Sequence, residues 1–180
     1  MYDGTKARQP REDTPRPVTE YGRQKRDAEA ELLAMLSSTP ACCIAILRLS
    51  KVISPNLALF RGWAESIKSD TPVTAFSDMM LAPVPVDLVA ATLARILRER
   101  RSGVFQLSGS RDVTYVDAAH CLCDAIGKSR SLVRPVLSLS TPPPVPNTTL
   151  DMTVEHSIWS LDPPETIASL SALAASFTKR

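Results

Sequence analysis

Hydrophobic and polar positions follow two different periods in the first part of the chain. From about Glu20 apolar residues recur every three or four positions until the polar stretch 37–40, and Thr19 precedes them as a helix cap, which predicts a helix. The stretch 41–49 is short, almost wholly apolar and bounded by turn residues. That pattern is typical of a strand buried on both faces, as in a parallel sheet.

The same two patterns continue downstream. They predict helices at about 56–68, 87–101 and 114–126 and a helical piece after Pro164, and short strands at 72–76, 104–107 and 132–139. Gly103 and Gly127 are expected to end two of these helices. The proline-rich segments 1–17 and 141–146 predict a surface loop and a stiff extended connector. Alternating helices and short apolar strands favour an α/β architecture.

Composition and charge narrow the class of protein. At 180 residues and 44% hydrophobic content the chain is long enough for a compact domain with a core. Its 21 basic and 19 acidic residues give a net charge of +2 without a concentrated basic face, so no nucleic-acid partner is expected. The longest apolar run, 41–47, is too short to cross a bilayer, and the start lacks the pattern of a signal peptide. We therefore expect a soluble, cytoplasmic protein that binds no membrane.

The four cysteines raise the question of a metal site. Cys121 and Cys123 form a C-x-C beside His120, and Cys42 is adjacent to Cys43. A C-x-C on a helix directs its two sulfurs apart, and no second ligand pair lies at a usual zinc spacing. Buried free thiols and no metal are the expectation.

One pair of residues has the spacing of an acid catalyst. Tyr21 and Lys25 are four residues apart, which places them on one face of the predicted helix. A lysine ammonium there would stabilise the phenolate and lower the pKa of the tyrosine, making it a general acid for a carbonyl oxygen. Spacing alone also fits an incidental pair on an exposed helix face, since Tyr2 and Lys6 have the same spacing in a loop.

The neighbours of this pair carry a resemblance to a known family. In order along most of the chain, the segments around the pair resemble the dTDP-4-dehydrorhamnose reductase family of the extended short-chain dehydrogenase/reductase superfamily. The segments are 3–6, 12–17, 21–29, 47–52, 83–88, 103–109 and 149–151. Several motifs in the same order are far more specific than the tyrosine–lysine spacing alone.

The resemblance implies roles for individual residues. Tyr21 would be the catalytic acid, and Lys25 would tune it and bind the nicotinamide ribose of the cofactor. Arg48 and Ser50 would lie beside the nicotinamide and the sugar, as cofactor and substrate ligands. The alternative for Arg48 is a strand-end arginine paired with a helix carboxylate, and for Asp87 a carboxylate that stabilises a helix N-terminus. The implied cofactor is NADP(H) or NAD(H), the implied substrate is a nucleotide sugar, and a homodimer is compatible with the family.

The cofactor-binding front end of the family has no counterpart here. Family members begin with a strand, a G-x-G-x-x-G turn and a helix that hold the pyrophosphate, but the six glycines of this chain are not spaced for such a turn. The expected fold is the second half of a Rossmann-like parallel sheet with a small C-terminal α/β substrate-binding subdomain, the dinucleotide-binding half missing. Residues 1–55 would be the Rossmann remnant and 56–180 the subdomain with returning Rossmann elements.

These expectations leave three functions open. The first is NADPH-dependent reduction of a nucleotide-linked 4-keto-sugar by a longer parent, with Met1 an internal start and no cofactor bound by this chain alone. Lys51 stands where rhamnose-forming members typically place a tryptophan, which disfavours dTDP-4-dehydrorhamnose as the substrate. The second is a non-catalytic sugar-nucleotide-binding or regulatory subunit, and the third an inactive truncated domain. Missing strands would expose the apolar edge of 41–49 and favour self-association.

Overall fold

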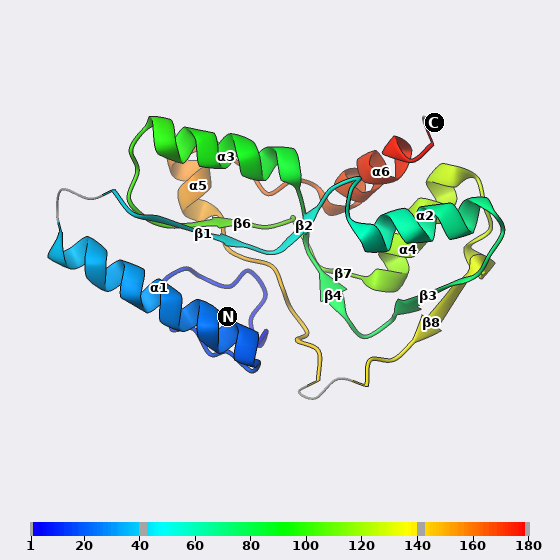
Figure 1. The fold of residues 1–180 in the computed structure, drawn as a ribbon, viewed down its shortest axis with the longest axis horizontal. Coiled ribbons are helices and arrows are strands. Elements are labelled where there is room, and N and C mark those ends of the chain that lie inside the picture. The colour runs from blue at the N-terminus through cyan, green and yellow to red at the C-terminus, as the bar shows by residue number, and fades with distance from the viewer. Residues whose placement is uncertain (1, 40–42, 140–142, 179–180) are drawn as a thin grey trace.

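The chain forms a mixed α/β fold of short strands and six α-helices in the computed structural model, which describes residues 2–39, 43–139 and 143–178 (Figure 1). The helices are α1 (Glu20–Ser38), α2 (Ala58–Lys68), α3 (Val86–Arg98), α4 (Tyr115–Ile126), α5 (Thr153–Trp159) and α6 (Thr166–Ser176), with a 3-10 turn at Arg130–Leu132. The strands are β1 (Ala45–Leu49), β2 (Lys51–Ile53), β3 (Val73–Phe76), β4 (Met80–Leu81), β5 (Pro83–Pro85), β6 (Gly103–Leu107), β7 (Val113–Thr114) and β8 (Val133–Val136).

Most strand pairs are parallel, as the sequence predicts. β1 pairs with β6, β2 with β5 and β3 with β8 in parallel, and β4 pairs with β7 antiparallel. Parallel partners need a crossover connection, and α2 supplies part of the one between β2 and β5. In the β1–β6 pair Ala45 lies opposite Gly103 and Leu49 opposite Leu107. Figure 1 shows α1 and α3 on opposite sides of this pair.

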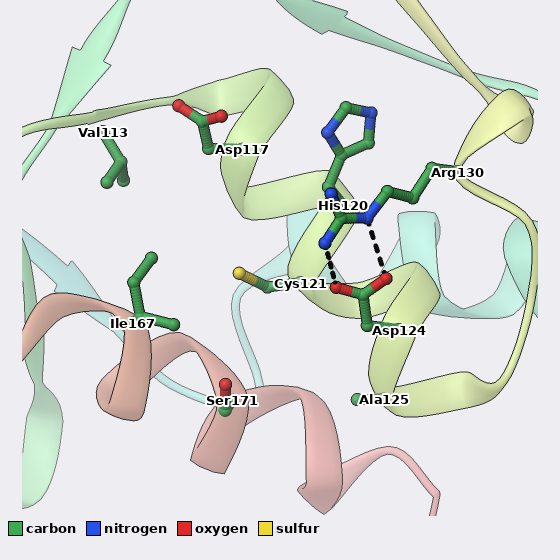
Figure 2. Close-up of a pocket in the computed structure, with 9 residues that line it drawn as sticks. All are labelled: Val113, Asp117, His120, Cys121, Asp124, Ala125, Arg130, Ile167 and Ser171. Atoms are coloured by element: carbon green, nitrogen blue, oxygen red, sulfur yellow. Dashed lines mark hydrogen bonds and ion pairs between the residues drawn. The ribbon is translucent and has the colours of Figure 1, made fainter.

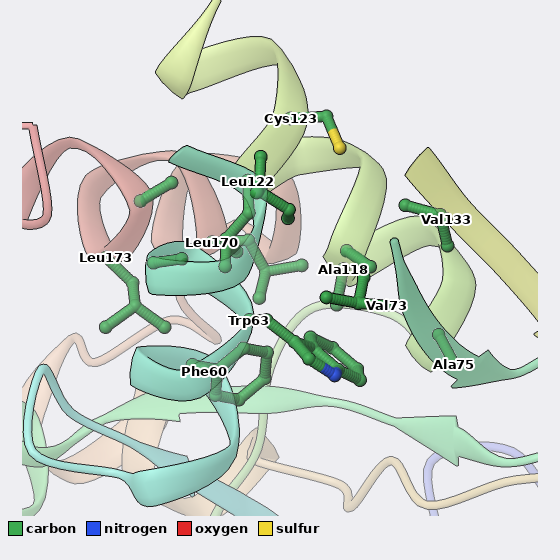
Figure 3. Packing of buried hydrophobic residues seen from close by; sticks show 14 of the residues in the cluster. Phe60, Trp63, Val73, Ala75, Ala118, Leu122, Cys123, Val133, Leu170 and Leu173 are labelled. Atoms are coloured by element: carbon green, nitrogen blue, oxygen red, sulfur yellow. The ribbon is translucent and has the colours of Figure 1, made fainter. Parts of the chain in front are cut away.

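Apolar packing is concentrated around α2, α4 and α6, which we call the helical core (Figure 3). Phe60, Ile67, Leu122 and Leu170 are fully buried there. The Trp63 ring meets Phe60 edge-on at 5.6 Å between centroids. Because each such side chain gains on the order of 2 kcal/mol from burial, this cluster supplies much of the driving force for folding.

Smaller apolar clusters lie under α3. One gathers Val84, Val89, Leu107 and Met152, and a second gathers Ile96, Phe105 and Trp159. They join α3 to β6 and α5. On the other side of the β1–β6 pair, α1, β1 and the N-terminal loop 2–19 form what we call the α1–β1 layer, in which Gly22 and Glu29 are the buried residues of α1.

Local end signals explain most of the predicted helices. The Thr19 hydroxyl accepts a hydrogen bond from the Gly22 N–H at 3.1 Å and starts α1. Thr114 and Asp117 form a capping box at the start of α4, and Gly127, with φ of 75°, ends it. The predicted helix after Pro164 is α6.

Gly103 does not end a helix, so that prediction is wrong. Helix α3 stops at Arg98, Arg100 takes a left-handed conformation with φ of 50°, and the Arg101 N–H closes the turn on the Ile96 carbonyl at 3.0 Å. Gly103 instead begins β6 with φ of 111°. An arginine therefore occupies the left-handed position that a glycine usually takes.

The strand expected at 41–49 is shorter and more exposed than predicted. Residues 41–42 lie outside the described residues, and β1 begins at Ala45. Arg48 is buried, but Ala45 and Leu49 are exposed, so burial on both faces is wrong. Within the described residues β1 has one partner strand, β6, and an ion pair between Arg48 and Glu29 joins β1 to α1.

Several features were not predicted from the pattern. Helix α5 and strands β2, β4, β5 and β7 are too short to show a period, and the strand expected at 132–139 is confined to 133–136. The N-terminal segment is not only a surface loop, because Gly4 and Gln9 are buried and Gln9 bridges Leu150. Within the described ranges no helix is long and apolar enough to cross a membrane. The domain division at residue 55 stays a prediction.

Candidate functional site

A cavity of about 670 Å³ lies where α1, the ends of β1 and β2, the N-terminal loop and the segment 145–150 meet. Tyr21, Lys25, Arg48 and Ser50 all line it. These residues come from a helix and from the end of a strand, the edge of a parallel sheet where ligands bind in open α/β folds. The structure therefore brings the four site residues of the sequence analysis to one cavity.

Tyr21 and Lys25 occupy the first two turns of α1 on its cavity side. The Lys25 Nζ lies 5.4 Å from the centre of the Tyr21 ring, a cation–π distance. Tyr21 is 70% exposed. Among the described residues neither side chain makes a hydrogen bond, so the phenol and the ammonium are both available to a ligand.

Arg48 is held by its own chain. Its Nε and one terminal nitrogen donate to the two carboxylate oxygens of Glu29, the Nε bond being 3.0 Å long. Its other terminal nitrogen donates to the Tyr2 hydroxyl and, at 2.8 Å, to the Arg11 carbonyl. Arg48 and Glu29 are both buried, so this is an ion pair between β1 and α1. The role of Arg48 as a cofactor and substrate ligand stays a prediction.

Tyr2 and Glu29 are cavity residues to which the sequence reasoning gave no role. The Tyr2 hydroxyl is half-buried against Arg48, and burial raises its pKa above the ordinary value although the charge of Arg48 opposes this. Glu29 follows Lys25 by four residues, the same step that separates Tyr21 from Lys25. This spacing could have indicated that Glu29 lies on the same helix face as Lys25. No residue near Tyr2 in the sequence indicates that its hydroxyl contacts Arg48.

Ser50 and Lys51 lie at the junction of β1 and β2. The Ser50 Oγ donates to the Ala82 carbonyl at 2.5 Å, which leaves its oxygen as an acceptor towards the cavity. Lys51 is half-buried and lines the same cavity. In the part of the chain that the structure describes, its ammonium has no hydrogen-bond or carboxylate partner. An unpaired cation at the wall favours ligands that carry an acceptor or a negative charge.

A second cavity, of about 480 Å³, lies between α4 and α6 beside the C-x-C motif (Figure 2). Asp124 and Arg130 neutralise each other through two hydrogen bonds of 2.9 and 2.6 Å. Burial raises the pKa of the Cys121 thiol, which keeps it protonated and a poor nucleophile. Cys123 is buried and reduced, Cys121 is half-buried and Cys43 is exposed, while Cys42 lies outside the described residues. No group of three or more potential metal ligands occurs among the described residues.

The residues present fit only one end of a dinucleotide cofactor. The Tyr21 hydroxyl and the Lys25 ammonium suit the hydroxyl groups of a ribose. A pyrophosphate needs glycines whose backbone faces a ligand. The tightly packed glycines here face their own chain: a Cβ on Gly109 would lie 2.8 Å from the Pro83 carbonyl, and one on Gly4 2.6 Å from the Val145 side chain.

The chain matches a known protein family over most of its length. A profile of the RmlD substrate binding domain matches residues 1–170. The chain belongs to this family. The resemblance to dTDP-4-dehydrorhamnose reductases seen in the sequence is thereby confirmed. A curated relative of the RmlD-family chain, the probable low-salt glycan biosynthesis reductase Agl14 of Haloferax volcanii, is 31% identical over 127 residues, which cover 67% of this chain and 41% of the relative.

Solved structures show the same fold in longer enzymes. A dTDP-glucose 4,6-dehydratase of Bacillus anthracis in complex with NAD matches with a TM-score of 0.83 at 15% identity, over 98% of this chain and 58% of that one. A dTDP-4-dehydrorhamnose reductase of the same organism in complex with NADP matches with a TM-score of 0.78 at 13% identity, over 96% and 61%. The RmlD-family chain thus spans about 60% of the length of these enzymes.

Proposed function

We propose that this chain is the part of an NAD(P)H-dependent nucleotide-sugar reductase that carries the proton donor and the sugar pocket. The observation that supports this most is the cavity that joins Tyr21 and Lys25 on α1 to Ser50 and Lys51 at the strand ends. In this proposal the parallel β1–β6 pair belongs to the second half of a Rossmann-like sheet, and the remainder of the chain includes a small substrate-binding subdomain. The half that binds the dinucleotide phosphates would lie in a longer parent protein.

The proposed chemistry is reduction of a keto group. The cofactor, when bound, supplies a hydride to the carbonyl carbon. Tyr21 donates its phenolic proton to the carbonyl oxygen, so the product is an alcohol and Tyr21 is left as a phenolate. Lys25 stabilises that phenolate by its positive charge and also binds the ribose hydroxyls of the cofactor. The exposure of Tyr21 leaves its hydroxyl open to both ligands.

The proposed substrate is a nucleotide-linked 4-keto-sugar. The names of two relatives, a glycan biosynthesis reductase and a dTDP-4-dehydrorhamnose reductase, support this class. Lys51 offers the sugar an ammonium where a tryptophan would offer a flat apolar face. A sugar with an acceptor or an acidic group at that position fits an unpaired ammonium better than dTDP-4-dehydrorhamnose does.

A non-catalytic sugar-nucleotide-binding subunit is the alternative. Such a subunit would need only the sugar pocket, which Ser50 and Lys51 line. The two proposals differ in whether a parent extended upstream consumes NADPH.

A measurement of NADPH turnover distinguishes the reductase from the non-catalytic subunit. We would measure NADPH oxidation with nucleotide-linked keto-sugars for the 180-residue chain and for a version extended upstream. The reductase proposal expects turnover by the extended version and a loss of roughly 100-fold or more in kcat for Tyr21→Phe in it. Arg23→Met, at an exposed position of the first turn of α1 that does not line the cavity, is the matched control and should keep full activity. Unchanged turnover in Tyr21→Phe would remove the catalytic assignment, and binding of a nucleotide sugar without any NADPH consumption would favour the subunit.

A further inference from the structure

We infer that Arg48 and Glu29 are positioning residues, which fix α1 on β1 and thereby place Tyr21 and Lys25 at the cavity. The inference rests on the proposed function, because it concerns the helix that carries the proposed acid. It gives Arg48 a role that acts through Glu29, without direct contact with a cofactor or substrate.

The first support is the weak apolar attachment of α1. Of its 19 residues, Gly22 and Glu29 are the buried ones, and Gly22 has no side chain. Leu33 and Leu36, which continue the face of Glu29, are only half-buried, and Leu32 and Met35 are 39% and 55% exposed. A helix of a globular protein is usually held by a buried apolar stripe. Here the buried side chain that ties α1 to the sheet is a carboxylate.

The second support is how fully the Arg48 guanidinium is used. A guanidinium has five N–H donors. Four of them are engaged: two by the Glu29 carboxylate, one by the Tyr2 hydroxyl and one by the Arg11 carbonyl. The two hydrogen bonds from Arg48 to the Glu29 carboxylate fix both the distance and the orientation of α1 relative to β1, which a single hydrogen bond would not do. Little donor capacity remains for a ligand.

The third support is that the contact continues into the rest of the fold. The Arg11 side chain donates to the Val104 carbonyl at 2.6 Å and to Glu155 Oε1 at 2.8 Å. Glu155 is fully buried in α5 and also accepts from the Gln106 N–H at 2.8 Å. A chain of buried polar contacts therefore runs from α1 through β1 and the N-terminal loop to β6 and α5. Buried charges are screened little by salt, so this chain keeps its strength in solution.

The geometry links the pair to the reactive end of the helix. Tyr21, Lys25 and Glu29 follow one another at four-residue steps and all line the cavity. One turn of helix separates Glu29 from Lys25, and a second separates Lys25 from Tyr21. A change in how Glu29 sits on Arg48 therefore moves the whole face that carries the proposed acid.

The test observes the tyrosine rings directly, without cofactor or substrate. The chain has three tyrosines, so ring-labelled tyrosine gives three assignable NMR signals for Tyr2, Tyr21 and Tyr115. Arg48→Lys keeps the positive charge but cannot make the two parallel hydrogen bonds to the carboxylate. Glu29→Gln keeps the size of the side chain but removes its negative charge. We expect both variants to shift the Tyr2 and Tyr21 signals, and to shift the Tyr115 signal less, because the Tyr115 ring packs on Trp63 of the helical core although it also lines the cavity. Arg26→Lys, which alters the exposed pair with Asp27, is the matched control and should shift none of them.

Hydrogen exchange supplies the second readout on the same full chain. Exchange of the α1 amides should accelerate by roughly 10-fold or more in both variants, while the α4 amides keep their rates. If Arg48→Lys does not fold, Glu29→Gln decides alone. An unmoved Tyr21 signal, or equal acceleration in α1 and α4, would overturn the inference. Neither readout depends on turnover, so the reductase proposal can fail while this one stands.

Discussion

The two sides of the molecule are held together by different forces. In the helical core, apolar side chains of α2, α4 and α6 pack with almost no exposed surface, as Phe60 and Leu170 show. In the α1–β1 layer an ion pair buries Glu29 on Arg48, and Arg11 of the N-terminal loop pairs with the buried Glu155 of α5. The candidate site lies on the charged side.

The difference shows how each side limits motion. Apolar burial is roughly proportional to area and has no preferred direction, so it stabilises a core without fixing one atom against another. A pair of hydrogen bonds between an arginine and a carboxylate holds the two groups in one plane. Removing either partner is strongly destabilising, because the other charge is left buried without a partner. A site that must present Tyr21 and Lys25 in a defined geometry, on a helix open to solvent, gains from the second kind of contact.

Truncation in the helical core should have the largest effect. Phe60→Ala removes a fully buried ring that packs against Trp63, and we expect a loss of about 4 kcal/mol in the free energy of unfolding. Urea denaturation followed by the fluorescence of Trp63, with Trp159 replaced by phenylalanine, measures it. Leu59→Ala at the neighbouring exposed position is the control and should cost less than about 1 kcal/mol. Similar losses for both would mean that the helical core is not the main source of stability.

Breaking the charged pair should come second. Arg48→Met leaves the Glu29 carboxylate buried without its partner, and we expect a loss of about 3 kcal/mol. Trp159 stacks at 5.2 Å on Phe105 of β6, the partner strand of β1, so it reports on the sheet that carries Arg48 when Trp63 is replaced by phenylalanine.

A double variant sharpens the same comparison. Glu29→Leu together with Arg48→Met replaces the ion pair by two apolar side chains, and it should recover most of the stability lost in Arg48→Met alone. That result would show that the pair serves geometry more than net stability. If the two losses simply add, the layer depends on Glu29 and Arg48 separately, and the contrast with the helical core disappears.

Much of the fold follows from signals that lie close together in the sequence. Thr19 and Thr114 mark the starts of α1 and α4, and Gly127 marks the end of α4, because their capping bonds join residues three or four positions apart. Strands of two or three residues, such as β4 and β7, have no such signal. β4 and β7 are strands only because they pair with each other in the folded chain, with Met80 opposite Thr114. The prediction that Gly103 ends α3 failed because Arg100 takes the left-handed conformation that closes this helix.

The candidate site divides in the same way. Tyr21 and Lys25 lie one helical turn apart, so their shared face could be predicted from spacing. The Arg48–Glu29 pair joins residues 19 positions apart, and Arg11 meets Glu155 across 144 positions. No periodicity encodes such contacts, which depend on how α1 and the N-terminal loop dock. The sequence offered a helix carboxylate as one partner for Arg48, but it could not choose between that partner and a ligand.

The helix caps test the comparison at a smaller scale. Thr114→Ala removes a capping box in the helical core and should cost about 1 kcal/mol of global stability. Thr19→Ala removes the corresponding cap of α1, where fewer buried contacts depend on the first turn, so the global cost should be smaller and local fraying larger. Urea denaturation measures the first effect, and hydrogen exchange of the first α1 turn the second. Equal global costs would contradict the weak attachment of α1.

The smallest effect concerns acid stability near Trp159. Hydrogen bonds from Trp159, Arg95 and Arg101 lower the pKa of Glu99 to about 2 from an ordinary 4.5. A lowered pKa means that the stabilisation is complete above 4.5 and is lost as the pH falls towards 2. Glu99→Gln should therefore flatten the decline of the Trp159-monitored urea midpoint in that window. Glu31→Gln, at an exposed α1 carboxylate, is the control, and an equal flattening there would trace the acid sensitivity to general charge rather than to the Glu99 hydrogen bonds.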